Sequence, residues 1–246
     1  MKDHFSIGSG DYSRYRPTYP DAFYKFLNSV TTHTENAWDC GTGNGQMAVR
    51  LAEYFENVFA TDISESQLQQ AHEVKGVHYS VQPAERTDFP DRFFDLIIAA
   101  QAAHWFDLES FYSEVRRTGR DNAVLVIMGY TLPRISAELD KVVDWFYNEI
   151  VGDYWDFERK YIDEGYLTMP FPFAEIKAPR MESRLDWTRT HLMGYLSTWS
   201  AVKQYIKVNG ETPMNYISDA IVRCWDGNAS KTVIFPLLIR MGMVSK

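Results

Sequence analysis

Apolar runs alternate with amphipathic stretches from residue 35 to residue 150. Five short apolar runs predict strands, at residues 36–40, 57–61, 77–81, 94–99 and 122–129. Stretches with helical spacing follow these runs, at residues 44–54, 64–74, 107–118 and 135–151. Such alternation is typical of a parallel sheet with helices on its faces. Ser64 and Asp107 stand where N-caps are favoured, which supports two of the helices.

The pattern changes after residue 151. Residues 152–172 are rich in aromatic side chains and proline and have no clear period, so we expect irregular or weakly helical chain there. The remaining predicted elements are a strand, two helices and a last strand, at residues 173–187, 188–207, 214–225 and 232–240. Pro179 interrupts the first of these strands. Pro236 predicts that the last strand has an edge position, a bulge or an amide facing away from the ladder.

Size and charge narrow the classes of function. The 246 residues are 45% hydrophobic, enough for one sizeable core, so we expect a single domain. The formal net charge of −8 disfavours binding to nucleic acid or to an anionic membrane surface and favours a small-molecule partner. The two cysteines have no metal-binding spacing, and no stretch reads as a signal peptide or membrane span, so a cytoplasmic protein without a bound metal is expected.

A glycine-rich turn follows the first predicted strand in "AWDCGTGNGQM". Glycines at this point allow a tight turn and let a ligand approach the backbone closely. Gln46 stands where the dinucleotide fingerprint needs its third glycine, and the lysine of a phosphate-binding loop is missing, which disfavours NAD and ATP. The charge of Asp39 would repel a pyrophosphate but attract an ammonium group. Asp62, at the end of the second predicted strand, can accept hydrogen bonds from the two hydroxyls of a ribose.

These residues therefore favour a nucleoside that carries an amino acid. Simpler explanations stay open, since the glycines can serve a plain turn, Asp39 can hold the amides of that turn, and Asp62 can cap a helix.

The same stretches resemble a known family. "AWDCGTGNGQMAVRLA" and "VFATDISESQLQQA" are similar to the first two motifs of class I S-adenosylmethionine-dependent methyltransferases, and "PAERTDFPDRFFDLIIAAQAAHWFD" is similar to their adenine loop and fourth strand. "YSRYRPTYP", "AQAAHWFD", "MGYTLPRI" and "YLSTWSAVKQY" resemble the trans-aconitate methyltransferase-like branch of the type 11 family. The resemblance implies a Rossmann-like α/β fold. Its seven-stranded sheet would have the order 3-2-1-4-5-7-6 with the last strand antiparallel, and helices would cover both faces. Residues 1–246 would form one such domain.

The resemblance also implies roles for individual residues. The cofactor, S-adenosylmethionine, would be held by Arg16, Asp39, Gly41, Gly43, Asp62, Ile63, Ala84, Glu85 and Gln101. Tyr12, Trp105 and Tyr130 would line the substrate pocket, and His104 is the candidate base or a pocket residue. Residues 1–30 would cover the cofactor, while residues 152–172 and 188–225 would cap the substrate side. Gln82 and Pro83 replace the aspartate frequent in the family, which weakens the case for a side-chain bond to adenine.

Two routes of methyl transfer stay open at this stage. A carboxylate acceptor is already a nucleophile, and Arg16 would orient it. A hydroxyl or amine must lose a proton, and His104 would then be the base. The resemblance favours a small acceptor that is methylated at a carboxylate oxygen, with methylation of a hydroxyl or amine as an alternative. A protein that binds S-adenosylmethionine without turnover is the alternative from another class, and the sequence does not indicate the oligomeric state.

Overall fold

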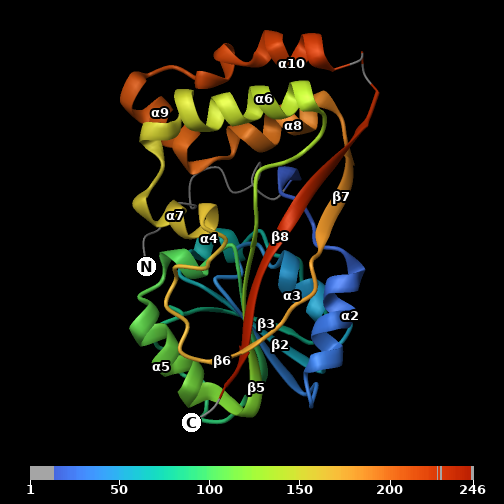
Figure 1. Cartoon of the computed structure of the whole chain (residues 1–246). Helices are drawn as coiled ribbons and strands as arrows, with labels where there is room; N and C mark the ends of the chain where they lie inside the picture. The colour runs from blue at the N-terminus through green and yellow to red at the C-terminus, as the bar shows by residue number, and fades with distance from the viewer. Residues whose placement is uncertain (1–13, 226, 228, 245–246) are drawn as a thin grey trace.

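The computed structural model describes residues 14–225, 227 and 229–244 (Figure 1). Its strands are β1 (Asn36–Cys40), β2 (Asn57–Asp62), β3 (Val77–Val81), β4 (Phe94–Ala100), β5 (Gly119–Tyr130), β6 (Ala174–Ile176), β7 (Glu182–Trp187) and β8 (Lys231–Met243). Its α-helices are α2 (Asp21–Val30), α3 (Gln46–Leu51), α4 (Glu65–Leu68), α5 (Leu108–Thr118), α6 (Ala137–Trp145), α7 (Lys160–Asp163), α8 (Arg189–Ser197), α9 (Ser200–Asn209) and α10 (Ser218–Cys224). No helix in this part of the chain is both long and apolar enough to cross a bilayer.

The strands form one sheet in the order β3-β2-β1-β4-β5-β8-β6, with β7 also paired to β8. The first five strands are parallel, whereas β8 runs antiparallel to β5, with Val126 opposite Met241. The predicted order and the antiparallel last strand are therefore confirmed. The predicted sixth strand consists of two pieces, β6 and β7, separated by a stretch that contains Pro179, and each pairs with a different half of β8.

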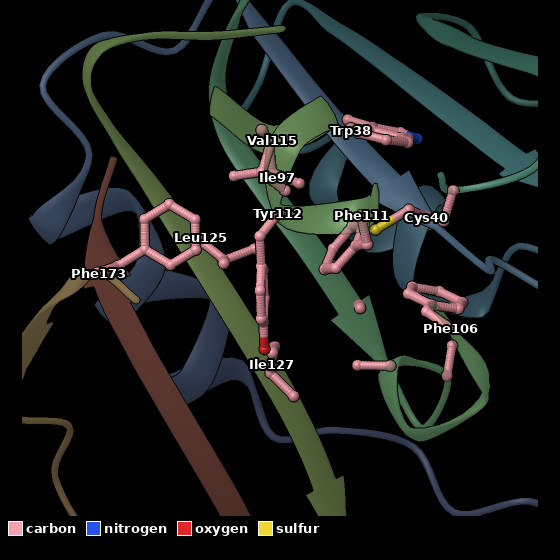
Figure 2. Close-up of a cluster of buried hydrophobic side chains, with 14 of the residues drawn as sticks. Trp38, Cys40, Ile97, Phe106, Phe111, Tyr112, Val115, Leu125, Ile127 and Phe173 are labelled. Atoms are coloured by element: carbon pink, nitrogen blue, oxygen red, sulfur yellow. The ribbon is translucent and has the colours of Figure 1, made fainter. Parts of the chain in front are cut away.

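Helices cover both faces of the sheet (Figure 1). On one face α5 packs over β1, β4 and β5, and Figure 2 shows Trp38, Phe111 and Val115 meeting in that cluster. On the other face Leu27 of α2 and Met47 of α3 belong to a second buried cluster. The two covered faces explain why β1 and β4 are buried along almost their whole length rather than at alternate positions.

Helix starts follow the predicted caps. The Ser64 side chain accepts a hydrogen bond from the Gln67 amide, and Asp107 accepts one from the Ser110 amide. The predicted helix over 64–74 was too long, however, because α4 ends at Leu68. The chain beyond it is mostly exposed and carries no apolar face to bury, and packing of such a face supplies most helical stability in proteins.

A further helical layer lies beyond the end of the sheet to which β5 leads (Figure 1). It consists of α6, α8, α9 and α10 and has its own buried cluster, which includes Val143, Leu196 and Val202. Phe235 of β8 joins the same cluster, so the long last strand connects the layer to the sheet. The stretch 152–172 contains only short helical turns and α7, in line with its irregular pattern.

Candidate functional site

Four parallel strands end at one pocket of about 860 Å³, measured with its open mouth. Its walls come from the chain after β1, β2, β4 and β5 and from the N-terminal segment: Arg16, Pro17, Tyr19, Asp39, Gly41, Thr42, Gly43, Asn44, Gln46, Met47, Asp62, Ile63, Ser64, Gln67, Ala100, Gln101, Ala102, Trp105 and Tyr130. We call it the first pocket. Ligands of open α/β sheets bind outside the carboxyl ends of the strands, and this pocket lies there.

The glycine turn forms one wall of the first pocket. Gly41 and Gly43 both have the left-handed backbone that favours glycine, with φ of 69° and 59°. A Cβ on Gly41 would lie 2.6 Å from the Cβ of Ala102, so the turn also needs glycine for close packing. Among the described residues, a Cβ on Gly43 would meet only one atom within 4 Å, the Gln67 side-chain oxygen at 3.9 Å. The wall at Gly43 is therefore bare backbone beside open space, as a closely approaching ligand requires.

Asp39 lies fully buried beneath this turn. One carboxylate oxygen accepts a hydrogen bond from the Thr42 hydroxyl, while Oδ1 has no hydrogen-bond partner among the described residues. Burial raises the pKa of Asp39 to about 7, and the nearby carboxylate of Asp62 adds to the rise. An unsatisfied buried carboxylate oxygen is costly unless a cation or donor occupies the adjoining space. The arrangement fits the ammonium group of an amino-acid ligand.

Asp62 ends β2 and is fixed by two backbone amides. Its Oδ2 accepts a hydrogen bond from Gly43 N and its Oδ1 accepts one from Ser64 N, each at 2.8 Å. The carboxylate is partly exposed and lines the first pocket beside Ile63. These two bonds hold the carboxylate in a fixed orientation at the pocket wall.

Gln101 follows β4 and lines the same pocket. Its φ of 56° is unusual for a residue other than glycine. The Gln101 amide donates to Met128 O at 2.8 Å, and Nε2 donates to Tyr130 O at 3.3 Å, so the left-handed residue links the ends of β4 and β5. Backbone of this kind costs about 1–3 kcal/mol and clusters at functional sites.

Arg16 joins the N-terminal segment to the sheet and to the helical layer. Its Nη1 donates to the Tyr130 hydroxyl at 3.0 Å, and its Nη2 donates to Thr198 O at 3.5 Å. The guanidinium also lies 5.6 Å from the centre of the Tyr195 ring. These contacts hold a cation at the rim of the first pocket.

A second pocket of about 440 Å³, measured with its mouth, adjoins the first. It is lined by Arg16, Gln101, His104, Trp105, Trp155, Arg159, Ile162, Trp199 and Ser200. Arg16, Gln101 and Trp105 line both pockets, so the two spaces meet at these residues. Besides these three residues and His104, the lining of the second pocket comes from residues 155–162 and 199–200.

His104 lines only the second pocket and is 6% exposed. Its ring lies 4.8 Å from that of Trp105, and Nδ1 has no hydrogen-bond partner among the described residues. Burial, together with the charge of Arg159, lowers the pKa of His104 to about 3. The imidazole is therefore neutral at physiological pH and a weak base.

Three residues that line the second pocket, Trp155, Arg159 and Ser200, were not singled out from the sequence. The Arg159 Nε donates to the Tyr147 hydroxyl at 3.0 Å, and the Arg159 guanidinium lies 4.7 Å from the Trp155 ring centre. Trp199 also lines the second pocket. The stretch 152–172 was predicted as a cap, but without a period it did not indicate which of its side chains line the pocket.

Two expected site residues lie elsewhere, and a third is not described by the structure. Ala84 is buried in the cluster under α5, and Glu85 accepts a hydrogen bond from the Asp107 amide, so neither lines the first pocket. Tyr12 lies outside the described residues. Within the described part of the chain, no three His, Cys, Asp or Glu side chains gather as a metal site would require.

Comparisons with known proteins agree with this geometry. The family described as "Methyltransferase domain" matches residues 38–127. A protein of Dictyostelium discoideum that is named as a methyltransferase is 35% identical over 227 residues, which cover 91% of this chain and 86% of the relative. A solved structure described as a type II methyltransferase from Anaeromyxobacter dehalogenans is 41% identical, with a TM-score of 0.87 over 94% of this chain and 98% of that one. The chain belongs to the S-adenosylmethionine-dependent methyltransferases.

Proposed function

We propose that the protein transfers the methyl group of S-adenosylmethionine to a carboxylate oxygen of a small acceptor bound in the second pocket. The observation that carries this proposal is the composition of that pocket. Two arginines line it, no acidic residue among the described ones does, and the histidine it contains is neutral. An ionised carboxylate needs charge pairing and no general base, which is what these walls offer.

The residues of the first pocket would hold the cofactor. The free oxygen of Asp39 faces the amino group, the glycine turn admits the methionine portion, and Asp62 accepts hydrogen bonds from the ribose, beside Ile63. S-adenosylmethionine supplies, when bound, a methyl group already activated by its sulfonium. The remaining task of the chain is to orient the acceptor and exclude water.

Arg16 is suited to orient the reacting carboxylate because it lines both pockets. The Tyr130 hydroxyl holds one of its terminal nitrogens, which limits the freedom of the guanidinium. Trp105, Trp155 and Trp199 supply apolar walls that keep water from the reacting atoms. In this scheme residues 1–30 cover the cofactor, and residues 152–172 with 188–225 form a cap on the substrate side.

A methylation screen tests the proposal. Carboxylic acids, phenols, amines and RNA would be offered with labelled S-adenosylmethionine to the wild type, Arg16→Gln and His104→Asn. We expect activity on acids only, a loss of about 10- to 100-fold with Arg16→Gln, as removal of a charge-assisted pair costs, and retention of most activity in His104→Asn. A phenol or amine substrate that depends on His104 would reverse the mechanism. Binding of S-adenosylmethionine with no transfer to any class would favour a binding protein.

A further inference from the structure

Two consecutive residues hold the N-terminal segment against helix α8. The Tyr15 ring packs on the buried cluster of the helical layer and lies edge-on to the His191 ring, with the ring centres 5.2 Å apart. Arg16, the next residue, donates to Thr198 O at 3.5 Å, just after the end of the same helix. His191 and Thr198 are about two helical turns apart, so the segment follows α8 rather than touching it at one point.

Gly194 lies in the interior of α8, between these two contacts. A Cβ on Gly194 would lie 2.5 Å from two atoms of the Tyr15 ring, Cε1 and Cζ, and 2.7 Å from a third, Cδ1. Nonbonded carbon atoms approach to about 3.5 Å, so even a methyl group at position 194 would displace the ring by about 1 Å. The helix itself gives no reason for a glycine, since alanine is the more favourable residue in a helix interior. The close approach of the Tyr15 ring does give one.

A displacement of Tyr15 would reach the site through Arg16. The Cα atoms of neighbouring residues are a fixed distance of about 3.8 Å apart, so the backbone of Arg16 has to follow that of Tyr15. The Arg16 side chain lines both pockets and is held between the Tyr130 hydroxyl, at 3.0 Å, and Thr198 O, at 3.5 Å. The second of these hydrogen bonds is already at the limit of its range, so a shift of about 1 Å is enough to break it.

We infer that Gly194 is a positioning residue for methyl transfer: its missing side chain admits the Tyr15 ring, and the docked ring holds Arg16 where the two pockets meet. Gly194 lines neither pocket, so it acts through Tyr15 and Arg16 and not on a ligand directly. The inference rests on the proposed function, because it takes Arg16 as the residue that orients the acceptor.

The test measures steady-state kinetics of methyl transfer, with the best acceptor from the methylation screen, for the wild type, Gly194→Ala, Tyr15→Ala, the variant with both changes and Arg16→Gln. Ser113→Ala is the control, because Ser113 is an exposed residue of α5 that lines neither pocket. Urea unfolding establishes that each variant is folded.

We expect kcat/KM to fall by about 10- to 100-fold in Gly194→Ala, because a misplacement of about 1 Å at a reacting site has an effect of that size. The fall should divide between kcat and KM as it does in Arg16→Gln, which a general loss of stability would not reproduce. Tyr15→Ala should lose activity as well. In that background Gly194→Ala should cause little further loss, because the new Cβ no longer meets a ring.

Trypsin gives a second readout that needs neither acceptor nor turnover. Arg14 is exposed and directly precedes Tyr15, so the rate of cleavage after Arg14 reports how often the segment leaves α8. Mass spectrometry should show cleavage several-fold faster in Gly194→Ala and Tyr15→Ala than in the wild type and Ser113→Ala.

The outcomes separate the inference from the proposed function. Wild-type kinetics in a folded Gly194→Ala variant, independent losses in the variant with both changes, or equal cleavage rates overturn the inference and leave the proposed function intact. If Gly194→Ala does not fold, wild-type activity in Tyr15→Ala overturns the inference in the same way. A wild type that methylates no carboxylic acid refutes the proposed function, while the same variants, compared on the acceptor that it does use, still decide the role of Gly194.

Discussion

The backbone amide of Gly43 donates a hydrogen bond to the Asp62 carboxylate at 2.8 Å, although the two residues belong to turns after different strands. The bond connects the turn after β1 to the end of β2. Ser64 N donates to the other oxygen of the same carboxylate, so the position of Asp62 is set by both turns. One acid therefore orders the glycine turn, and in the proposed scheme the same acid accepts hydrogen bonds from the ribose.

Asp62→Ala is expected to weaken binding of S-adenosylmethionine by about 1.5–3 kcal/mol, because hydrogen bonds to a charged acceptor contribute about that much. Calorimetric titration measures the change. Asp186→Ala is a suitable control, because Asp186 is an exposed acid in β7 that accepts a hydrogen bond from Thr232. A folded Asp62→Ala variant with the wild-type dissociation constant would mean that the ribose is held elsewhere.

Gly41→Ala should destabilise the protein more than Gly210→Ala. Both glycines have positive φ, 69° and 74°, so each alanine incurs a similar backbone cost of about 1–2 kcal/mol. Only the Cβ at position 41 meets a neighbour, Ala102 Cβ at 2.6 Å, and such overpacking costs about 1–3 kcal/mol more. Denaturant unfolding of both variants gives the difference. An equal loss of unfolding free energy in both variants would show that the turn accommodates the extra Cβ at position 41 with no added energetic penalty.

The sheet could be predicted because its signals are local in sequence. Each central strand is an apolar run such as 94–99, and each is followed by a turn and a helical pattern, so order and direction follow from the family resemblance and the connection rules. The break at Pro179 was also readable, since proline cannot donate in a ladder. The length of α4 was not, because a helix ends where tertiary packing stops, and no local residue marks Leu68 as the last.

The two pockets also differ in how far local sequence signals predict the residues that line them. The first is built mostly from residues within a few positions of strand ends, such as Asp39 and Asp62, so a motif reveals it. The second is lined in part by residues that are more than 50 positions away from His104 along the chain, and only the fold brings Arg159 and Trp199 into the same pocket. An aromatic stretch without periodicity gives no indication of which side chains face inward.

Binding of S-adenosylmethionine should release a proton to solvent below pH 7. The pKa of Asp39 is about 7 in the protein, and a ligand ammonium beside its open oxygen favours the carboxylate. The affinity should therefore rise with pH up to about 7 and then level off, on this linkage. Calorimetry in buffers of different ionisation enthalpy measures the proton count. Asp39→Asn should abolish the release, and an unchanged count in that variant would assign the proton to another group.

The last prediction concerns stability against pH, where Asp39 and His104 act in opposite directions. The folded pKa of Asp39, about 7, lies above its ordinary value of 3.8, so the folded state binds the extra proton between these values, and stability falls as pH rises through this window. The folded pKa of His104, about 3, lies below its ordinary 6.5, so the unfolded state binds the extra proton, and stability falls as pH drops from 6.5 toward 3.

Between pH 3.8 and 6.5 the two dependences nearly cancel, because each group exchanges about one proton. A variant that removes one of the two groups should reveal the pH dependence of the other. In Asp39→Asn the free energy of unfolding should gain a slope of up to about +1.4 kcal/mol per pH unit relative to the wild type, and in His104→Asn a slope of equal size and opposite sign. Urea unfolding across this pH range measures both slopes, and the double variant should return to the wild-type slope. Parallel curves for all four proteins would show that neither group is perturbed as its burial implies.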